Sequence, residues 1–196
     1  MNFSGVVLAG GENKRYQGVV KATLIVNGKP IIERTLELFN RLFDEIVIVT
    51  NNSEAFSSYK QFRMVEDIYK GIGPLGGLHA ALHDVKSDAI FMAASDMPWL
   101  SEELIQSMIN YFEKAGCEVL LPRYNGKDEP LHAIYATSVK DSLDNFLGET
   151  NRFAIREFLK LVKVEYFNAE IPGSERNPFA NINRPEDMQG ILNGAH

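Results

Sequence analysis

Cysteine is almost absent from this chain of 196 residues, because Cys117 is the only one. A disulfide within the chain is therefore impossible, and a cysteine-rich zinc site is excluded. Cys117 comes just before the apolar stretch 119–121, so we expect a small buried side chain rather than a nucleophile. Such sparse use of cysteine is typical of proteins from a reducing cytosol.

Long apolar runs and an excess of positive charge are also missing. No stretch approaches the roughly 18–20 apolar residues that cross a membrane, and the first residues lack the features of a secretory signal. The chain has 20 Lys and Arg against 26 Asp and Glu, a formal net charge of −6. Because nucleic acids and membrane surfaces are anionic, we expect neither as a partner. We expect a cytoplasmic protein whose anionic ligands bind in a local basic pocket.

The sequence does contain enough apolar residues for one hydrophobic core. They make up 45% of the chain, and a chain of this length buries roughly 70% of the surface that it exposes when unfolded. No repeat, low-complexity tract or long linker interrupts it. We therefore predict a single domain over residues 1–196.

Short β-branched runs alternate with helical patterns along the chain. Strands are predicted at 4–9, 22–26, 45–50, 64–66, 89–94, 119–122, 131–136 and 164–167. Helices are predicted from Pro30, at 76–82, from an N-cap at Ser101 to about Ala115, at 139–147, 153–161 and 185–192. This alternation predicts an α/β fold of three layers, with a mostly parallel sheet, helices on both faces and a Rossmann-like arrangement.

Three predicted strands end at Ala9, Thr50 and Ala94, and each is followed by polar or glycine-rich sequence. Ligands of such sheets bind outside the carboxyl ends of the strands. We therefore expect the functional residues in the loops that follow these three positions.

The loop after Ala9 combines glycines with basic side chains. Gly10 and Gly11 allow a ligand to approach the backbone closely, and successive N–H groups in such a loop can bind phosphate oxygens. Arg15 and Lys21 add cationic donors, whose charge-assisted hydrogen bonds contribute roughly 1.5–3 kcal/mol each. The loop is neither a Walker A loop nor a GxGxxG motif. A surface turn with solvated charges is the alternative, but the clustered cations favour phosphate binding.

Two aspartates also follow predicted strands. Asp96 comes directly after the strand at 89–94, where a carboxylate could hold a Mg²⁺ ion that bridges nucleotide phosphates. Its alternative role is to cap a turn before Pro98. Asp67 could bind a ribose or a base, or cap a turn. The glycine-rich segment 73–78 could line a flat base or act only as a connecting loop.

The histidines do not predict a metal site. His79 and His83 are four residues apart but lack the HExxH pattern, so we expect structural or surface roles for them. We also find no Ser-His-Asp arrangement and no Gly-x-Ser-x-Gly elbow.

Residues 8–11, Arg15, Gly18 and Lys21 together resemble the opening motif of the nucleotidyltransferase superfamily that activates sugars and cofactors. Four further motifs recur in the order of a narrower family, at Gly73–Leu78, Ser95–Leu100, Pro130–Tyr135 and Asn181–Asp187. The ordered set resembles the molybdenum cofactor guanylyltransferases from Gly5 to about Met188.

This resemblance implies a nucleotidyltransferase that transfers GMP from GTP to the terminal phosphate of the molybdenum cofactor, releases pyrophosphate and requires Mg²⁺. It implies GTP contacts from Leu8, Ala9, Gly10, Gly11, Lys21, Asn51, Asp67, Gly76 and Asp96. Arg15, Lys21 and Asp96 would be the catalytic group, with Asp96 as the metal ligand. Asn181 and Asn183 would contact the acceptor. Asn52 is an alternative to Asn51.

Three positions depart from the family pattern. Residues 13–18 read Asn-Lys-Arg-Tyr-Gln-Gly where the family has Ser-x-Arg-Met-Gly, His132 replaces a common Phe, and Arg184 replaces the usual Thr. Alternative functions are cytidylyl transfer to the same cofactor, nucleotidyl transfer to a sugar phosphate, or nucleotide binding without catalysis. Proteins that deliver or accept the cofactor are candidate partners.

Overall fold

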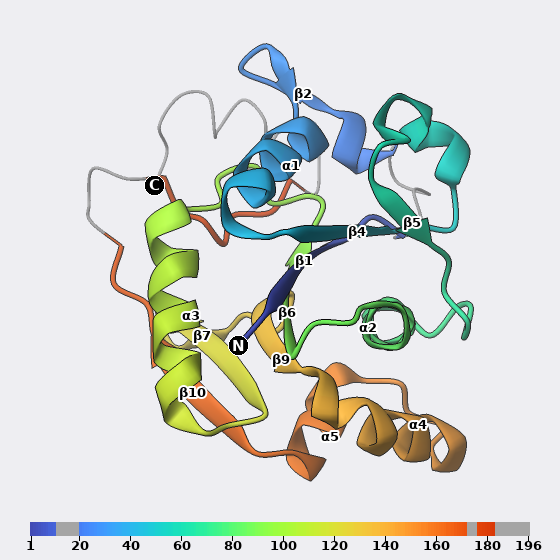
Figure 1. Cartoon of the computed structure of the whole chain (residues 1–196), viewed down its shortest axis with the longest axis vertical. Helices are drawn as coiled ribbons and strands as arrows, with labels where there is room; N and C mark the ends of the chain where they lie inside the picture. The colour runs from blue at the N-terminus through green and yellow to red at the C-terminus, as the bar shows by residue number, and fades with distance from the viewer. Residues whose placement is uncertain (11–19, 172–175, 183–196) are drawn as a thin grey trace.

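The computed structural model describes residues 1–10, 20–171 and 176–182 (Figure 1). The strands are β1 (Phe3–Leu8), β2 (Ile25–Val26), β3 (Lys29–Pro30), β4 (Glu45–Val49), β5 (Arg63–Val65), β6 (Ala89–Ala94), β7 (Val119–Tyr124), β8 (Lys127–Asp128), β9 (His132–Ala136) and β10 (Val164–Asn168). The α-helices are α1 (Ile31–Leu42), α2 (Pro74–Asp84), α3 (Glu102–Ala115), α4 (Lys140–Glu149) and α5 (Ile155–Phe158). Among these helices, none is long and apolar enough to cross a membrane. The helix predicted at 185–192 lies outside the described residues.

The main sheet has the strand order β10-β7-β9-β6-β1-β4-β5, with β8 paired to β7. Strand β1 runs parallel to both β4 and β6, which confirms the mostly parallel sheet. Strand β9 runs antiparallel to β6 and β7, and the short β8 runs antiparallel to β7. Only residues 125–131 separate β7 from β9, and a parallel crossover needs a dozen or more residues. The chain instead reverses at Asn125 and Gly126, which have φ angles of 49° and 74°.

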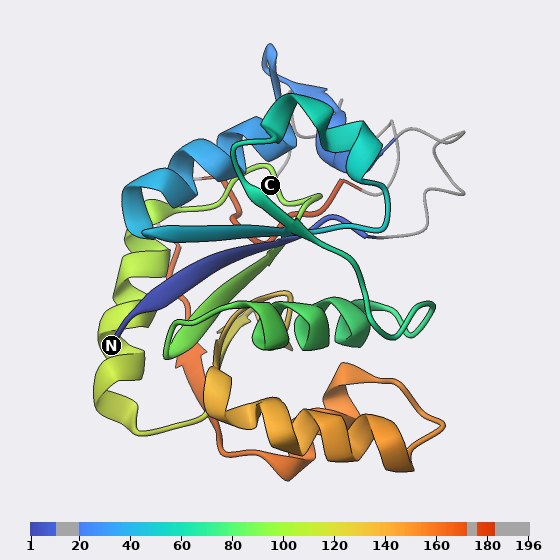
Figure 2. The same ribbon diagram turned by 45° about the vertical axis from the view of Figure 1, so that its right-hand side comes forward.

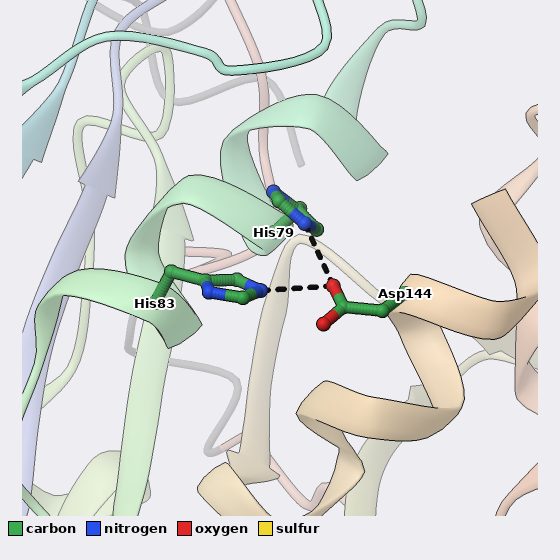
Figure 3. Close-up of side chains that lie close together, drawn as sticks. All are labelled: His79, His83 and Asp144. Atoms are coloured by element: carbon green, nitrogen blue, oxygen red, sulfur yellow. Dashed lines mark hydrogen bonds and ion pairs between the residues drawn. The ribbon is translucent and has the colours of Figure 1, made fainter. Parts of the chain in front are cut away.

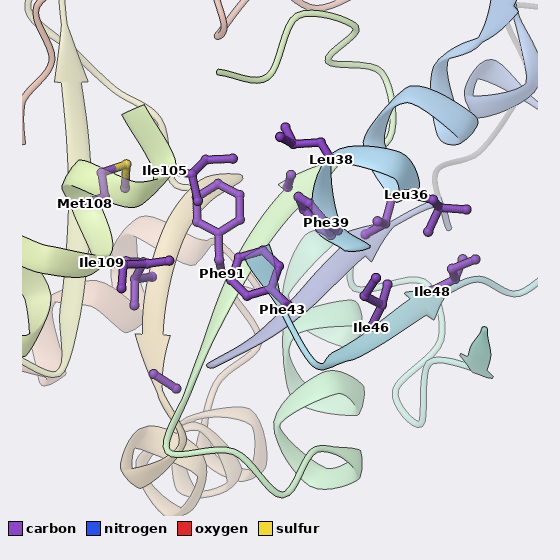
Figure 4. Close-up of a cluster of buried hydrophobic side chains, with 14 of the residues drawn as sticks. Leu36, Leu38, Phe39, Phe43, Ile46, Ile48, Phe91, Ile105, Met108 and Ile109 are labelled. Atoms are coloured by element: carbon purple, nitrogen blue, oxygen red, sulfur yellow. The ribbon is translucent and has the colours of Figure 1, made fainter. Parts of the chain in front are cut away.

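Helices cover both faces of this sheet, as Figures 1 and 2 show. Helices α1 and α3 pack on one face, and α2, α4 and α5 pack on the other. Alternate side chains of each central strand point to opposite faces. In β4, for example, Ile46 and Ile48 contact the layer of α1 and α3, whereas Val47 and Val49 contact the layer of α2 and α4. Figure 4 shows the first of these clusters, in which Phe39, Phe43 and Phe91 pack together.

The segment predicted as a strand at 22–26 is mostly a turn, so that prediction was wrong over its first half. Residues Lys21–Thr23 form a 3-10 turn, in which the backbone N–H and the hydroxyl of Thr23 both donate to the carbonyl of Val20. Only β2 remains extended, and it forms a hairpin with β3 through a turn at Asn27 and Gly28. The 3-10 turn sets the position of Lys21.

His132 is the most completely buried histidine of the described residues, with no exposed surface. It lies on β9, and its ring makes edge contacts with Phe91 and Phe179 at centroid distances of 5.1 and 4.8 Å. Among the residues that the structure describes, neither ring nitrogen has a hydrogen-bond partner. Burial lowers the pKa of His132 to about 3, so the ring is neutral at pH 7. His132 therefore packs as a neutral aromatic ring.

We predict that His132→Phe stabilises the fold by about 1–2 kcal/mol at pH 7, because it removes two unsatisfied buried nitrogens while retaining an aromatic ring. The substitution also changes the pH dependence. Folding depresses the pKa of His132 from 6.5 to about 3. Protonation of His132 therefore leaves the free energy of unfolding unchanged above pH 6.5 and lowers it progressively as the pH falls toward 3. His132→Phe removes this part of the acid sensitivity. Urea denaturation at several pH values measures both effects, and equal stability and pH slope in the two proteins would contradict them.

Candidate active site

A cleft of about 580 Å³ opens at the carboxyl ends of β1, β4 and β6. Two hydrogen bonds hold these strand ends together: the Ala9 N–H donates to the Val49 carbonyl at 2.8 Å, and the Ser95 N–H donates to the Leu8 carbonyl at 3.0 Å. The three strand ends predicted to carry function therefore meet at one site. The lining residues are Leu8, Ala9, Gly10, Val20, Lys21, Val49, Asn51, Asp67, Gly71, Gly73, Pro74, Gly77, Ala94, Ser95, Asp96 and Leu131.

Lys21 and Asp96 form an ion pair in this cleft. The Lys21 Nζ lies 3.3 Å from Oδ2 of Asp96, and their side chains are 24% and 21% exposed. Lys21 comes from the 3-10 turn before the β2–β3 hairpin, and Asp96 follows the end of β6. Partial burial strengthens interactions between such charges relative to bulk water. A carboxylate in this position can bind a metal ion, and the neighbouring cation can bind the phosphates that the metal also contacts.

Asn51 and Asp67 form a second polar pair, on the other side of β1. The Asn51 amide nitrogen donates to Oδ2 of Asp67 at 2.8 Å, and the Asp67 backbone N–H donates to the Asn51 side-chain oxygen at 3.1 Å. Burial raises the pKa of Asp67, and the hydrogen bond from Asn51 partly offsets this. Asn52 has a different role, because its side chain accepts the Ala55 N–H and caps a 3-10 helix. Of the two candidate asparagines, only Asn51 lines the cleft.

The start of the glycine loop also lines the cleft. Leu8, Ala9 and Gly10 are all lining residues. The Ala9 N–H donates to the Val49 carbonyl at 2.8 Å, and the Ala9 carbonyl accepts the Thr50 hydroxyl at 3.4 Å, so the backbone of Ala9 is tied to β4. Gly11 and Arg15 lie outside the described residues, and their predicted contacts stay predictions.

The glycine-rich segment 73–78 lines the cleft through Gly73, Pro74 and Gly77, whereas Gly76 is not a lining residue. A Cβ atom at Gly77 would lie 2.8 Å from Leu8 and 3.7 Å from Oδ1 of Asp67, so this helix start packs closely against the strand ends. A Cβ atom at Gly76 would lie 2.6 Å from the Tyr69 carbonyl and 3.4 Å from Cγ of Asp67. Gly76 therefore supports the loop that carries Asp67, and its predicted contact with GTP stays a prediction.

The segment predicted to contact the acceptor lies beside Asp96. The Ile182 N–H donates to the Asp96 carbonyl at 2.9 Å. Asn181 is exposed, and its side-chain amide donates to the Phe179 carbonyl at 3.4 Å. Asn181 does not line the cleft itself, and Asn183 lies outside the described residues.

Sequence reasoning assigned no role to several lining residues, namely Val20, Val49, Gly71, Ala94, Ser95 and Leu131. Ser95 and Leu131 do lie in motifs of the family resemblance, and Ser95 immediately precedes Asp96. The place of Leu131 at the cleft depends on the reversed direction of β9, which the sequence did not predict. Its carbonyl accepts the Ala94 N–H at 2.9 Å, which brings it to the end of β6.

Comparison with known proteins gives the family of this chain. The sequence model of the MobA-like NTP transferase domain matches residues 5–165. The chain belongs to this family. A probable molybdenum cofactor guanylyltransferase from Thermococcus gammatolerans is 36% identical over 97% of this chain and 99% of its own length. One from Natranaerobius thermophilus is 35% identical over 96% and 94%.

A solved structure of the same kind has a similar fold. Molybdopterin-guanine dinucleotide biosynthesis protein A from Archaeoglobus fulgidus matches with a TM-score of 0.80 and 32% identity over 96% of both chains. Membership of the MobA-like family makes this chain a nucleotidyltransferase.

We predict that Gly76→Ala weakens nucleotide binding by about tenfold or more. The added Cβ meets a backbone carbonyl at 2.6 Å, so the loop bearing Asp67 must shift. Gly148→Ala is the matched control, because Gly148 also lies in a helix but its added Cβ meets nothing within 4 Å. The control should bind nucleotide normally and be equally or slightly more stable, since Ala favours helix by about 1 kcal/mol over Gly. Equal GTP affinity in both variants, measured by titration calorimetry, would rule out the supporting role of Gly76.

Proposed function

We propose that this protein transfers GMP from GTP to the terminal phosphate of the molybdenum cofactor and releases pyrophosphate. The observation that carries the proposal is the position of two polar pairs on either side of β1. Lys21 and Asp96 lie at the β6 side, 3.3 Å apart, and Asn51 and Asp67 lie at the β4 and β5 side. The first pair suits the phosphates of a nucleotide, and the second suits the hydrogen-bonding groups of its nucleoside.

The names of the relatives support the choice of substrates. Relatives of nearly the same length are called molybdenum cofactor guanylyltransferases, which points to GTP as donor and the molybdenum cofactor as acceptor. The acceptor segment supports this choice as well, since its backbone is hydrogen-bonded to Asp96. An acceptor bound at Asn181 and Asn183 would therefore lie next to the phosphate end of GTP.

Asp96 is the residue that we propose to hold Mg²⁺. Mg²⁺ usually binds through one or two carboxylates together with substrate phosphates and water, and a partly exposed carboxylate in the cleft fits this requirement. When bound, Mg²⁺ would neutralise charge on the phosphates of GTP. Lys21 pairs with Asp96 in this structure, and it would turn to the phosphates when nucleotide and metal bind.

The reaction requires positioning and charge stabilisation more than proton transfer. An oxygen of the acceptor phosphate attacks the α-phosphorus of GTP, and the bond from that phosphorus to the pyrophosphate oxygen breaks. The attacking phosphate is already anionic, so no general base is needed. Lys21, together with Arg15 of the opening loop, would stabilise the charge that develops on the leaving pyrophosphate. Asn51, Asp67 and the backbone at Gly10 would hold the nucleoside in place.

We predict that Lys21→Ala lowers kcat/KM for GTP about ten- to a hundredfold. This corresponds to roughly 1.5–3 kcal/mol of lost transition-state stabilisation. Lys29→Ala is the control, because Lys29 lies on the β2–β3 hairpin and its exposed side chain pairs with Glu37 outside the cleft. The control should turn over at the normal rate. A Lys21→Ala enzyme with unchanged kcat/KM would remove Lys21 from the mechanism.

Pyrophosphate release with the molybdenum cofactor as acceptor tests the proposed function. We expect release with GTP and Mg²⁺, little release with CTP or ATP, and a loss of the reaction in Asp96→Asn. Pyrophosphate release only with CTP would instead indicate a cytidylyltransferase. Binding of GTP without release, for any acceptor phosphate supplied, would favour a non-catalytic nucleotide-binding role.

A further inference from the structure

Three side chains outside the cleft form a compact cluster between α2 and α4 (Figure 3). His79 and His83 come from α2, and Asp144 comes from α4. Both Nε2 atoms lie 2.8 Å from the same oxygen, Oδ1 of Asp144. Residues four apart share one face of a helix, which explains why the two rings point the same way. The potential ligand atoms all lie within 4.8 Å of one another.

Two of the three groups are shifted toward the protonation states that metal ligands need. Burial lowers the pKa of His79, which favours its neutral ring. Partial burial of Asp144 opposes ionisation, but the hydrogen bonds from His83 and His79 outweigh it and lower the pKa of this carboxyl. Metal binding requires neutral imidazole and ionised carboxylate.

The hydrogen bonding of the cluster is incomplete. His79 is only 5% exposed, and within the described chain its buried Nδ1 has no hydrogen-bond partner. The two rings lie 4.3 Å apart and share one acceptor atom. Two imidazoles from α2 and one carboxylate from α4 thus converge on a single point, Oδ1 of Asp144.

We propose that His79, His83 and Asp144 bind a transition-metal ion of the Zn²⁺ class and so link α2 to α4. A tetrahedral zinc site with bonds of about 2.0–2.1 Å separates neighbouring ligand atoms by about 3.4 Å. The present 2.8 Å contacts must therefore widen by about 0.6 Å on binding. His83 and Asp144 are 33% and 38% exposed, so their side chains have room to move and water can complete the coordination. Two imidazole ligands select against Mg²⁺ and Ca²⁺, which prefer oxygen.

The site is separate from the cleft but adjoins its wall. None of the three ligands lines the cleft, whereas Gly73, Pro74 and Gly77 at the start of the same helix do. The ring of His79 also makes an edge contact with Tyr69 at 4.9 Å, in the loop between Asp67 and α2. A metal at this site would therefore stabilise the element that forms one side of the nucleotide pocket.

Titration of the untagged full-length protein with Co²⁺, in the absence of nucleotide, tests the proposal. We expect one equivalent of Co²⁺ to bind with visible absorption bands of low-symmetry coordination, and Zn²⁺ but not Mg²⁺ to displace it. His83→Gln and Asp144→Asn keep similar side-chain shapes, and each should weaken Co²⁺ binding at least tenfold. Asp96→Asn is the control and should bind Co²⁺ at this site normally.

Two results would overturn the proposal. One is the absence of Co²⁺ absorption in folded wild-type protein, and the other is equal Co²⁺ affinity in wild type, His83→Gln and Asp144→Asn. Circular dichroism checks that each variant is folded. Because the titration contains no GTP or acceptor, its outcome is independent of the proposed guanylyl transfer.

Discussion

The parallel pairing of β1 with β4 and β6 is the constraint on which the functional site depends. It aligns three carboxyl ends, and the bonds from Ala9 to Val49 and from Ser95 to Leu8 extend that alignment past the last paired residues. The loops that follow these strands therefore surround one cleft. Residues from positions 8 to 96 become neighbours there, although no two of the loops are close in sequence.

Within the cleft, the two aspartates differ because of their partners rather than their own chemistry. Asp67 is held by two hydrogen bonds to Asn51, and burial raises its pKa. Asp96 faces a lysine instead and remains partly exposed. A carboxylate fixed by an amide suits the recognition of hydroxyl and N–H groups, and a carboxylate beside a lysine suits phosphate and metal. One cleft thus offers different environments to the two ends of a nucleotide.

Sequence patterns predicted the central strands and the edge of the sheet where Asp96 and Lys21 meet, since both follow from local apolar runs and turn residues. Features that depend on contacts between residues far apart in sequence could not be predicted. The reversal of β9, and with it the place of Leu131, follows from a short hairpin connection. The support role of Gly76 depends on the path of the Tyr69 loop. His79 and His83 were expected to have structural or surface roles because they lack the HExxH pattern, and their partner Asp144 lies 61 residues beyond His83 in sequence.

The most direct test of this account is the affinity of guanosine, GMP and GTP, measured by calorimetry for wild type, Lys21→Ala and Asn51→Ala. If Lys21 faces the phosphate chain and the Asn51–Asp67 pair faces the nucleoside, Lys21→Ala should weaken GTP selectively and leave guanosine unchanged. Asn51→Ala should weaken all three ligands by a similar factor. Loss of guanosine binding in Lys21→Ala, or a loss confined to GTP in Asn51→Ala, would contradict the proposed orientation of the nucleotide in the cleft.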